Sequence, residues 1–290
     1  METVWLLTNQ WLRWERFEQQ FAALGAAAAA TGRLRLQRVS NDWVAAHATQ
    51  LSRSALPAAV LVMDKDLPVL RLLEARGVRL INSAQAVADC DDKLYTFASL
   101  AGAGVAQPDT LAVPLHYQPL TREQWRSSEF SRQVREFLGF PLVLKHAVGS
   151  WGQGVFLLHS EEELLDHLAA AQGQRLLVQR YTASSHGQDT RLYMVGRRCV
   201  AAMERRGVGG DFRTNVTGGG TAVSATPSDG QLQAARTAMK ALGLEIGSVD
   251  FLGELVCEVN SNAQFMTLME VTGCDVAAQV IDYVARQVAR

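Results

Sequence analysis

Two carboxylates interrupt a strand-forming stretch, GSVDFLGELVCEVNSN, residues 247–262, where a sheet would favour Val and Leu. If the stretch folds as a hairpin, Asp250 and Glu258 face each other only when the loop has an odd number of residues. A three-residue turn centred on Glu254 satisfies this condition. Asn260 then shares a face with Glu258, because strand residues two apart point the same way. Such an all-oxygen cluster suits a hard cation such as Mg²⁺, although a solvent-facing polar stripe explains the pattern equally well.

A lysine followed by closely spaced glycines marks a second stretch, LVLKHAVGSWGQGV, residues 142–155. Lys145 ends a predicted strand, and Gly149, Gly152 and Gly154 form a tight turn before the next one. Glycine lets backbone N–H groups approach phosphate oxygens, and the lysine can neutralise one of those oxygens. The P-loop and dinucleotide fingerprints are both absent, so the loop would act as a lid over phosphates. Taken alone, the glycines fit an ordinary flexible hairpin better.

A third cluster is rich in arginine. Arg191, Arg205 and Arg213 lie close in sequence to Asp189 and Asn215. Arg191 falls within a predicted strand and Arg205 at the end of another, where a buried guanidinium needs an anionic partner. A phosphate or a carboxylate would serve as that partner. Surface ion pairing in an arginine-rich chain is the simpler alternative.

Composition limits the class of protein. The chain has 290 residues, 48% of them hydrophobic, so it can bury a large core and divide into two or three subdomains around a cleft. A net charge of -1 gives no sign of a nucleic-acid or anionic-membrane surface. No secretory leader or membrane span is recognisable, so we expect a cytoplasmic protein. The scattered cysteines argue against a zinc site or disulfides, and Cys257 is expected to point into the core, away from Glu258.

The order of predicted elements indicates a mixed α/β protein. Strands and helices alternate up to about residue 90, which indicates a small α/β domain with a mainly parallel sheet. Residues 114–135 are polar and irregular, and we expect a linker or partly ordered insertion that becomes helical toward its end. Strands and helices that carry the three clusters make up the remainder.

In order, the three clusters resemble those of the ATP-grasp carboxylate–amine ligases, and within them the RimK-type group. The match runs from about residue 82 to the end of the chain, and its most specific parts are LVLKHAVGSWGQGV, LVQRY, GQDTRLYMVG, AAMERRGVGGDFRTN, SVDFL, CEVNSN and TGCDVA. The resemblance implies an α/β (α+β) fold, with two α+β subdomains gripping a nucleotide after a small α/β parallel-sheet domain. We expect the N-terminal domain at 1–90, the ATP-grasp N-subdomain with its glycine-rich lid loop at 91–177, and the C-subdomain with the Mg²⁺ site at 178–290.

The resemblance also implies roles for individual residues. The nucleotide-binding residues would be Lys93, Lys145, Gly149, Ser150, Gly152, Gly154, Gln179, Arg180, Tyr181 and Asp189. The lysines would contact the phosphates under the glycine-rich loop, residues 179–181 would line the adenine pocket, and Asp189 would lie near the ribose. The magnesium ligands would be Asp250, Glu258 and Asn260. The residues around the γ-phosphate and the acyl phosphate would be Arg191, Arg205, Arg213 and Asn215.

Two positions depart from the family pattern. Arg180 stands where the family usually has a Glu between the Gln and the Tyr of the hinge, so the usual acidic partner of the nucleotide is missing. After the metal ligands the family typically reads Asn-x-x-Pro-Gly, whereas this chain reads NSNAQF. A rigid turn beside the active site is thereby replaced, which alters how substrate is received.

The implied activity is ATP-dependent ligation through an acyl phosphate, with an amide product and release of ADP and phosphate. The added group would be glutamate or another amino acid, and the acceptor a small molecule or a peptide. ATP and Mg²⁺ would be needed, with Mn²⁺ as an alternative metal. The partners would be a carboxylate substrate and an amine co-substrate, without nucleic acid or membrane, and a homo-oligomer, dimer or tetramer, is left open. Two alternatives are an ATP-grasp enzyme with a non-amide product and a catalytically silent nucleotide-binding regulator or scaffold.

Overall fold

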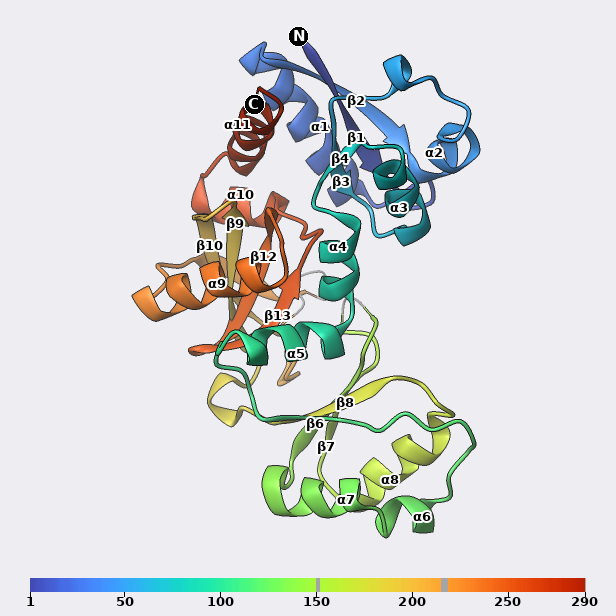
Figure 1. Cartoon of the computed structure of the whole chain (residues 1–290). Coiled ribbons are helices and arrows are strands. Elements are labelled where there is room, and N and C mark those ends of the chain that lie inside the picture. The colour runs from blue at the N-terminus through green and yellow to red at the C-terminus, as the bar shows by residue number, and fades with distance from the viewer. Residues whose placement is uncertain (150–151, 215–218, 290) are drawn as a thin grey trace.

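Three sheets follow one another along the chain in the computed structural model, which describes residues 1–149, 152–214 and 219–289 (Figure 1). The first sheet is parallel, with the strand order β2-β1-β3-β4. Its elements are β1 (Glu2–Thr8), α1 (Glu15–Thr31), β2 (Leu34–Ser40), α2 (Asn41–His47), η1 (Arg53–Ala55), β3 (Ala59–Met63), α3 (Leu67–Ala75) and β4 (Arg79–Ile81). The run AVLVM in β3 is buried along its whole length, as an inner parallel strand covered on both faces must be.

The second sheet is antiparallel, with the order β5-β8-β6-β7. The elements of this part of the chain are α4 (Ala84–Asp91), α5 (Lys93–Gly102), β5 (Thr110–Ala112), α6 (Arg122–Arg126), α7 (Glu129–Gln133), the π-helical turn η2 (Val134–Leu138), β6 (Leu142–His146), β7 (Val155–Leu158), α8 (Glu161–Ala170) and β8 (Leu176–Arg180). Residues 114–135 become helical toward their end, as expected, but the helical part is packed into the second unit and is not a linker. Trp125 of α6 and Phe130 of α7 are buried in the core beneath this sheet. These two short helices are amphipathic, which is why the sequence around the two aromatic residues is mostly polar.

The third sheet is antiparallel and has five strands, in the order β11-β10-β9-β12-β13. Its elements are η3 (Ala183–Ser185), β9 (Gln188–Val195), β10 (Arg198–Arg206), β11 (Thr221–Ser224), α9 (Asp229–Ala241), β12 (Ile246–Leu252), β13 (Leu255–Asn260), α10 (Met266–Thr272) and α11 (Val276–Val288). Residues on one face, such as Val249 and Phe251, pack with α9 and α5. On the other face, Tyr193 packs with α10 and α11, and the stretch they leave uncovered carries charged side chains.

The C-terminal helix packs against the N-terminal unit (Figure 1). Val280 and Val284 of α11 share a core with Phe21 and Leu24 of α1, so the third sheet and the first are packed through these helices (Figure 1). The part of the chain that the structure describes has no helix both long and apolar enough to cross a membrane.

We propose two refinements to the expected division of the chain. The strand β8 completes the second sheet, so that unit extends to residue 180. Helix α5 packs its Leu100 with Phe251 and Val259 of the third sheet, although it precedes the second sheet in sequence. The helix therefore positions its first residue, Lys93, over the third sheet.

Candidate active site

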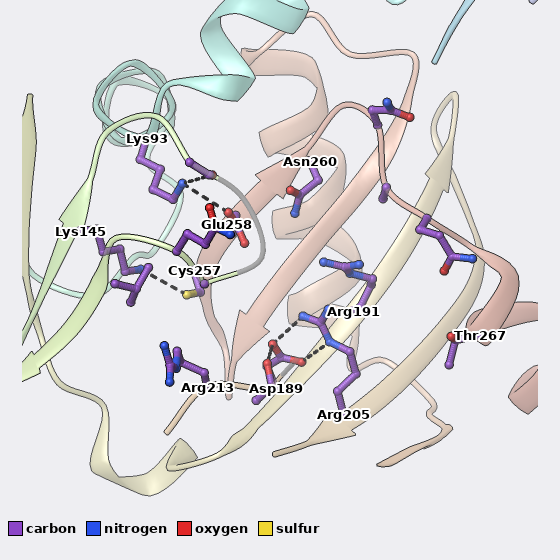
Figure 2. A pocket seen from close by; sticks show the side chains of 18 of the residues that line it. Lys93, Lys145, Asp189, Arg191, Arg205, Arg213, Cys257, Glu258, Asn260 and Thr267 are labelled. Carbon is purple, nitrogen blue, oxygen red and sulfur yellow. Dashed lines mark hydrogen bonds and ion pairs between the residues drawn. The ribbon is translucent and has the colours of Figure 1, made fainter. Parts of the chain in front are cut away.

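A cavity of about 970 Å³ lies where the three units meet (Figure 2). The expected site residues that line it are Lys93, Lys145, Gly149, Gly152, Gln179, Arg180, Tyr181, Asp189, Arg191, Arg205, Arg213, Glu258 and Asn260. Gly154 and Asp250 do not line it, and Ser150 and Asn215 lie outside the described residues. The sequence clusters therefore converge on one space.

The hairpin β12–β13 pairs Asp250 directly with Glu258, but not through the expected three-residue turn. Leu252 pairs with Leu255, which leaves a two-residue turn, and the register shifts by one between Asp250 and Phe251. Cys257 is the extra residue of this β-bulge, and the bulge supplies the odd count that a three-residue turn would have given.

The bulge also overturns the expectation that Cys257 points into the core. The Cys257 side chain lines the cavity, and its Sγ lies 3.7 Å from the Lys145 Nζ (Figure 2). Strict strand alternation would have placed the Cys257 side chain on the face of the sheet opposite to that of Glu258. A bulge changes this, because two successive residues then face one residue on the partner strand. Burial raises the pKa of the Cys257 thiol.

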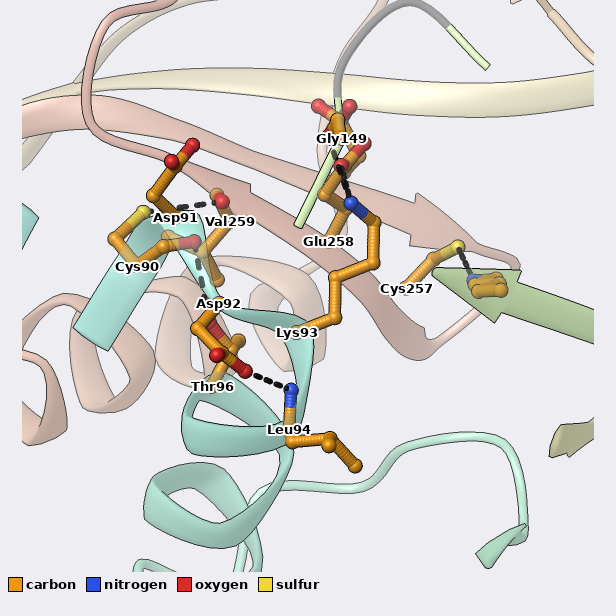
Figure 3. Close-up of polar contacts among 12 residues, drawn as sticks. Cys90, Asp91, Asp92, Lys93, Leu94, Thr96, Gly149, Cys257, Glu258 and Val259 are labelled. Carbon is orange, nitrogen blue, oxygen red and sulfur yellow. Dashed lines mark hydrogen bonds and ion pairs between the residues drawn. The ribbon is translucent and has the colours of Figure 1, made fainter. Parts of the chain in front are cut away.

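Two lysines flank Glu258 from different elements. Lys93 is the first residue of α5, where the side chain of Asp92 caps the helix by accepting the N–H of Leu94 (Figure 3). The Lys93 Nζ donates to the Gly149 carbonyl at 2.9 Å and lies 3.7 Å from the Glu258 Oε1. Lys145, on β6, is only 8% exposed. Both lysine side chains thus line the cavity together with Gly149 and Gly152 of the glycine-rich turn.

Charged side chains form a ladder across the open face of the third sheet. Arg191 on β9 pairs in register with Asp250 on β12, and Arg205 on β10 pairs with Asp189 on β9. The Arg191 Nε and Nη2 donate to the two Asp250 oxygens at 2.7 and 2.6 Å. The Arg205 Nη2 reaches both acids, at 2.6 Å from the Asp189 Oδ2 and 2.9 Å from the Asp250 Oδ2. Bidentate pairs of this kind are rigid and well suited to hold guanidinium groups in place.

The environment of Asp250 keeps it ionised. Burial by itself would raise the pKa of this carboxyl, but Arg191 and Arg205 outweigh burial and lower the pKa below its ordinary value. Asp250 is 2% exposed, is paired with both arginines and does not line the cavity. Among the expected metal ligands, only Glu258 and Asn260 line the cavity.

The hinge between the second and third sheets lies at one side of the cavity. The Gln179 side chain is buried and donates to the Thr110 hydroxyl at 2.9 Å. The Arg180 guanidinium bonds to Asp109 and to the carbonyls of Phe137 and Leu138, so the unusual arginine is satisfied by groups of the second unit.

Two further expected residues have local roles in the structure. Gly154 has a φ of +69°, and an added Cβ would lie 2.7 Å from the His146 ring, so the turn itself requires glycine there. Arg213 is partly exposed and pairs with its neighbour Asp211 at 2.9 Å. That exposed pair costs little to break, which leaves Arg213 available to a ligand.

The N-terminal unit and the loop after β13 also line the cavity, and the sequence reasoning missed them. These residues include Asn9, Trp11, Arg13, Asp64, Asn262 and Gln264. Asn9 and Asp64 directly follow β1 and β3, and ligands of open α/β sheets bind at the carboxyl ends of parallel strands. That rule, applied to the polar residues after each buried run, could have found them.

Comparison with known proteins places the chain in a family. Residues 90–284 match the RimK-like ATP-grasp domain. The chain belongs to this family, as its sequence clusters predict.

Several curated proteins resemble the chain in sequence. β-Citrylglutamate synthase B of Danio rerio is 34% identical over 256 residues, covering 85% of this chain and 60% of that protein. N-acetylaspartylglutamate synthase A of Homo sapiens is 32% identical, and the match covers 79% of this chain and 58% of that protein. A probable alpha-L-glutamate ligase of Stutzerimonas stutzeri (strain A1501) is 34% identical, covering 75% and 71%. The chain thus spans about 60% of the length of the curated relatives it matches first.

Solved structures share the whole fold at lower identity. D-cycloserine synthetase DcsG superposes with a TM-score of 0.70 at 20% identity, covering 99% of both chains. D-alanine–D-alanine ligase from Bacillus anthracis complexed with ATP gives 0.70 at 15% identity, covering 100% of this chain and 98% of that one. The expected ATP-grasp fold, with its preceding parallel-sheet unit, is therefore confirmed.

Proposed function

We propose that this chain is an ATP-dependent carboxylate–amine ligase. The observation that carries the proposal is the meeting of Lys93, Lys145 and Glu258 with Arg191 and Arg205 around one cavity (Figure 2). Phosphoryl transfer asks a protein mainly for positioning and for neutralisation of charge, which these side chains supply. The family match and the relatives named above support the same activity.

The proposed reaction has two steps. A substrate carboxylate oxygen attacks the γ-phosphorus of ATP and ADP leaves, which forms an acyl phosphate. An amine then attacks the acyl carbon, phosphate leaves with that same oxygen, and the amine loses a proton to give an amide. Lys93 and Lys145 would neutralise the nucleotide phosphates, while Arg205 and Arg213 would hold the transferred phosphoryl group. No side chain of the protein has to act as a nucleophile.

The residues around Glu258 fit a Mg²⁺ ion. The Glu258 and Asn260 side chains both line the cavity, and carboxylate and amide oxygens are ligands that suit Mg²⁺. Asp250 accepts three N–H bonds, which leaves about one of the roughly four acceptor positions of a carboxylate. We assign Glu258 and Asn260 as the ligands. Asp250, which does not line the cavity and is bonded to Arg191 and Arg205, fits the expected role of third ligand less well and would hold these arginines beside the ion. When bound, the ion would neutralise charge on the phosphates, and Mn²⁺ would substitute for it.

The hinge would receive the nucleotide base. Gln179 and Tyr181 line the cavity beside it and would contact the adenine. Arg180 would contribute no polar contact to the base, because its guanidinium is bonded to Asp109 and to two backbone carbonyls. Asp189 would lie near the ribose while holding Arg205.

We propose that one substrate is an amino acid, with glutamate as the first candidate. The support is that the names of three relatives at 32–34% identity all contain glutamate. The other substrate would be a small molecule or a peptide. The residues available to recognise the two substrates are those of the N-terminal unit and the loop after β13 that line the cavity.

Substrate-dependent release of ADP tests the proposal. Purified protein with Mg·ATP would be assayed against pairs drawn from the amino acids, small carboxylates and peptides, alongside Glu258→Gln. We expect turnover with at least one pair, and its loss in the variant. Tight ATP binding without turnover on any pair would instead favour a silent nucleotide-binding protein.

A further inference from the structure

A buried carboxylate lies at the edge of the N-terminal sheet and lines the cavity on the side away from the hinge. Asp64 directly follows β3 and is 7% exposed. It does not cap the following helix, because that position belongs to Asp66, whose side chain accepts the N–H of Val69. The start of α3 therefore does not account for the Asp64 carboxylate.

The partners of Asp64 are neutral amides. The Asn9 side chain donates to its two oxygens at 3.1 and 3.4 Å, and the backbone N–H of Lys65 donates to the Oδ1 at 2.8 Å. Within the described residues, no lysine or arginine forms an ion pair with this carboxylate, and the Lys65 Nζ is paired with Asp91 instead. Burial consequently raises the pKa of Asp64. Burying an ionised carboxylate without a cation costs free energy, and a positively charged ligand next to Asp64 would offset that cost.

Unsatisfied amide atoms lie in the loop after β13, which lines the same cavity. The Asn262 Oδ1 and the Gln264 Nε2 are buried and have no hydrogen-bond partner among the described residues. Buried polar atoms without partners are few in folded proteins, and each one calls for an explanation. Both belong to NSNAQF, the segment that stands where the family pattern has Pro-Gly. A polar ligand in the cavity would satisfy them.

We propose that Asp64 is the acceptor for a protonated amino group of the substrate, with Asn262 and Gln264 binding polar atoms of the same molecule. The ligand class is an amine-bearing polar molecule such as a free α-amino acid, whose ammonium supplies the missing cation and whose carboxyl oxygens accept from the Gln264 amide. An N-acylated amino acid, which has no ammonium, is excluded from this position. The inference rests on the proposed ligase function and assigns recognition of its amino-acid substrate to the N-terminal unit.

A binding measurement tests this position independently of turnover. Protein saturated with a non-hydrolysable ATP analogue and Mg²⁺ would be titrated by calorimetry with each proteinogenic amino acid and with its N-acetyl derivative. We expect at least one free amino acid to bind, and its N-acetyl derivative to bind at least about tenfold more weakly, as loss of a charge-assisted hydrogen bond implies. Asp64→Asn should weaken binding of the free amino acid by a similar factor and leave the affinity for the ATP analogue unchanged.

Two further variants separate recognition from structural damage. Asp42→Asn removes an exposed carboxylate of the N-terminal unit that does not line the cavity, and this variant should bind the amino acid as the wild type does. Asp64→Glu retains the charge and should recover part of the lost affinity. The inference is overturned if no free amino acid binds, if free and N-acetylated forms bind equally, or if Asp64→Asn binds like the wild type. Failure of the ligase activity alone would appear as binding without turnover.

Discussion

Asp250 lies directly across the β12–β13 hairpin from Glu258, yet only Glu258 lines the cavity, whereas Asp250 is buried in ion pairs with Arg191 and Arg205. Two carboxylates that look equivalent in sequence therefore have different duties. Asp250 fixes two guanidinium groups, while Glu258 is left to meet a ligand. Each duty predicts a different consequence of removing the charge.

We predict that Asp250→Asn lowers the free energy of unfolding by about 3 kcal/mol or more, because breaking a buried ion pair leaves charges uncompensated. Glu258→Gln should change it by no more than about 0.5 kcal/mol, since this side chain is 37% exposed and has only a loose ion pair with Lys93. Urea unfolding of the two variants beside the wild type measures both values. Equal losses would show that Asp250 does not support the arginine ladder.

Nucleotide affinity should depend on Lys145 much more than on a surface lysine. Lys145→Gln removes a buried cation from the cavity and should weaken binding of an ATP analogue by about tenfold or more. The matched control is Lys240→Gln on α9, an exposed residue that does not line the cavity, which should bind as the wild type does. Calorimetric titration gives the two dissociation constants. An unchanged constant for Lys145→Gln would exclude its contact with phosphate.

The thiol of Cys257 should report occupancy of the nucleotide site. Because its side chain lies beside Lys145 in the cavity, a small thiol reagent should react there and block binding of the ATP analogue. Burial raises the pKa of this thiol, so the rate should keep increasing as pH rises past the ordinary thiol value of about 8.5.

The matched control for this labelling is Cys257→Ser. Its remaining cysteines, Cys90, Cys199 and Cys274, do not line the cavity, so reagent should leave nucleotide binding intact. Mass spectrometry of the labelled peptide follows the reaction, and prior addition of ATP analogue should slow it. Labelling of Cys257 at the same rate with and without nucleotide would contradict the placement.

The stability of the protein should reveal the charge on Asp64. Burial raises the pKa of this carboxyl in the folded state above that of the unfolded chain. The folded protein then holds the proton more tightly, so this group's contribution is most favourable below the unfolded pKa of about 3.9 and is lost as pH rises through the folded pKa.

Asp64→Asn avoids that loss while keeping the hydrogen-bond acceptor for Lys65 N–H. We expect its Tm at neutral pH, without substrate, to exceed that of the wild type by roughly 2–4 °C for a gain of about 1 kcal/mol. The gain should vanish near pH 3, where both side chains are neutral. Calorimetric scans at the two pH values measure this, and a Tm below that of the wild type at neutral pH would mean that the ionised carboxylate stabilises the fold.

Much of the site could be predicted from sequence because its residues lie on strands with regular spacing. Alternation placed Glu258 and Asn260 on one face, and the lysine before the glycine turn indicated phosphate. The position of Cys257 could not be predicted, because a β-bulge reverses strand alternation without a signal in residue type. The pairing of Asp250 with two arginines depends on the register of β9 and β10, which sequence spacing does not reveal.

The fold could be predicted less evenly. The buried run of β3 and the alternation around it identified the parallel sheet, because inner parallel strands are apolar throughout. The helical end of residues 114–135 could be predicted, but its packing could not, because α6 and α7 are only five residues each and depend on burial of Trp125 and Phe130. Tertiary packing, and not local sequence, determines the structure of such short segments.

Transfer of a carboxylate oxygen to phosphate tests the proposed ligase most directly. The substrate pair that supports ADP release would be used with its carboxylate labelled with ¹⁸O, and the phosphate formed would be analysed by mass spectrometry. Activation through an acyl phosphate predicts one labelled oxygen in each phosphate, together with one amide per ADP. Phosphate that contains no label, released alongside ADP, would show that the carboxylate never attacked ATP and would contradict the proposal.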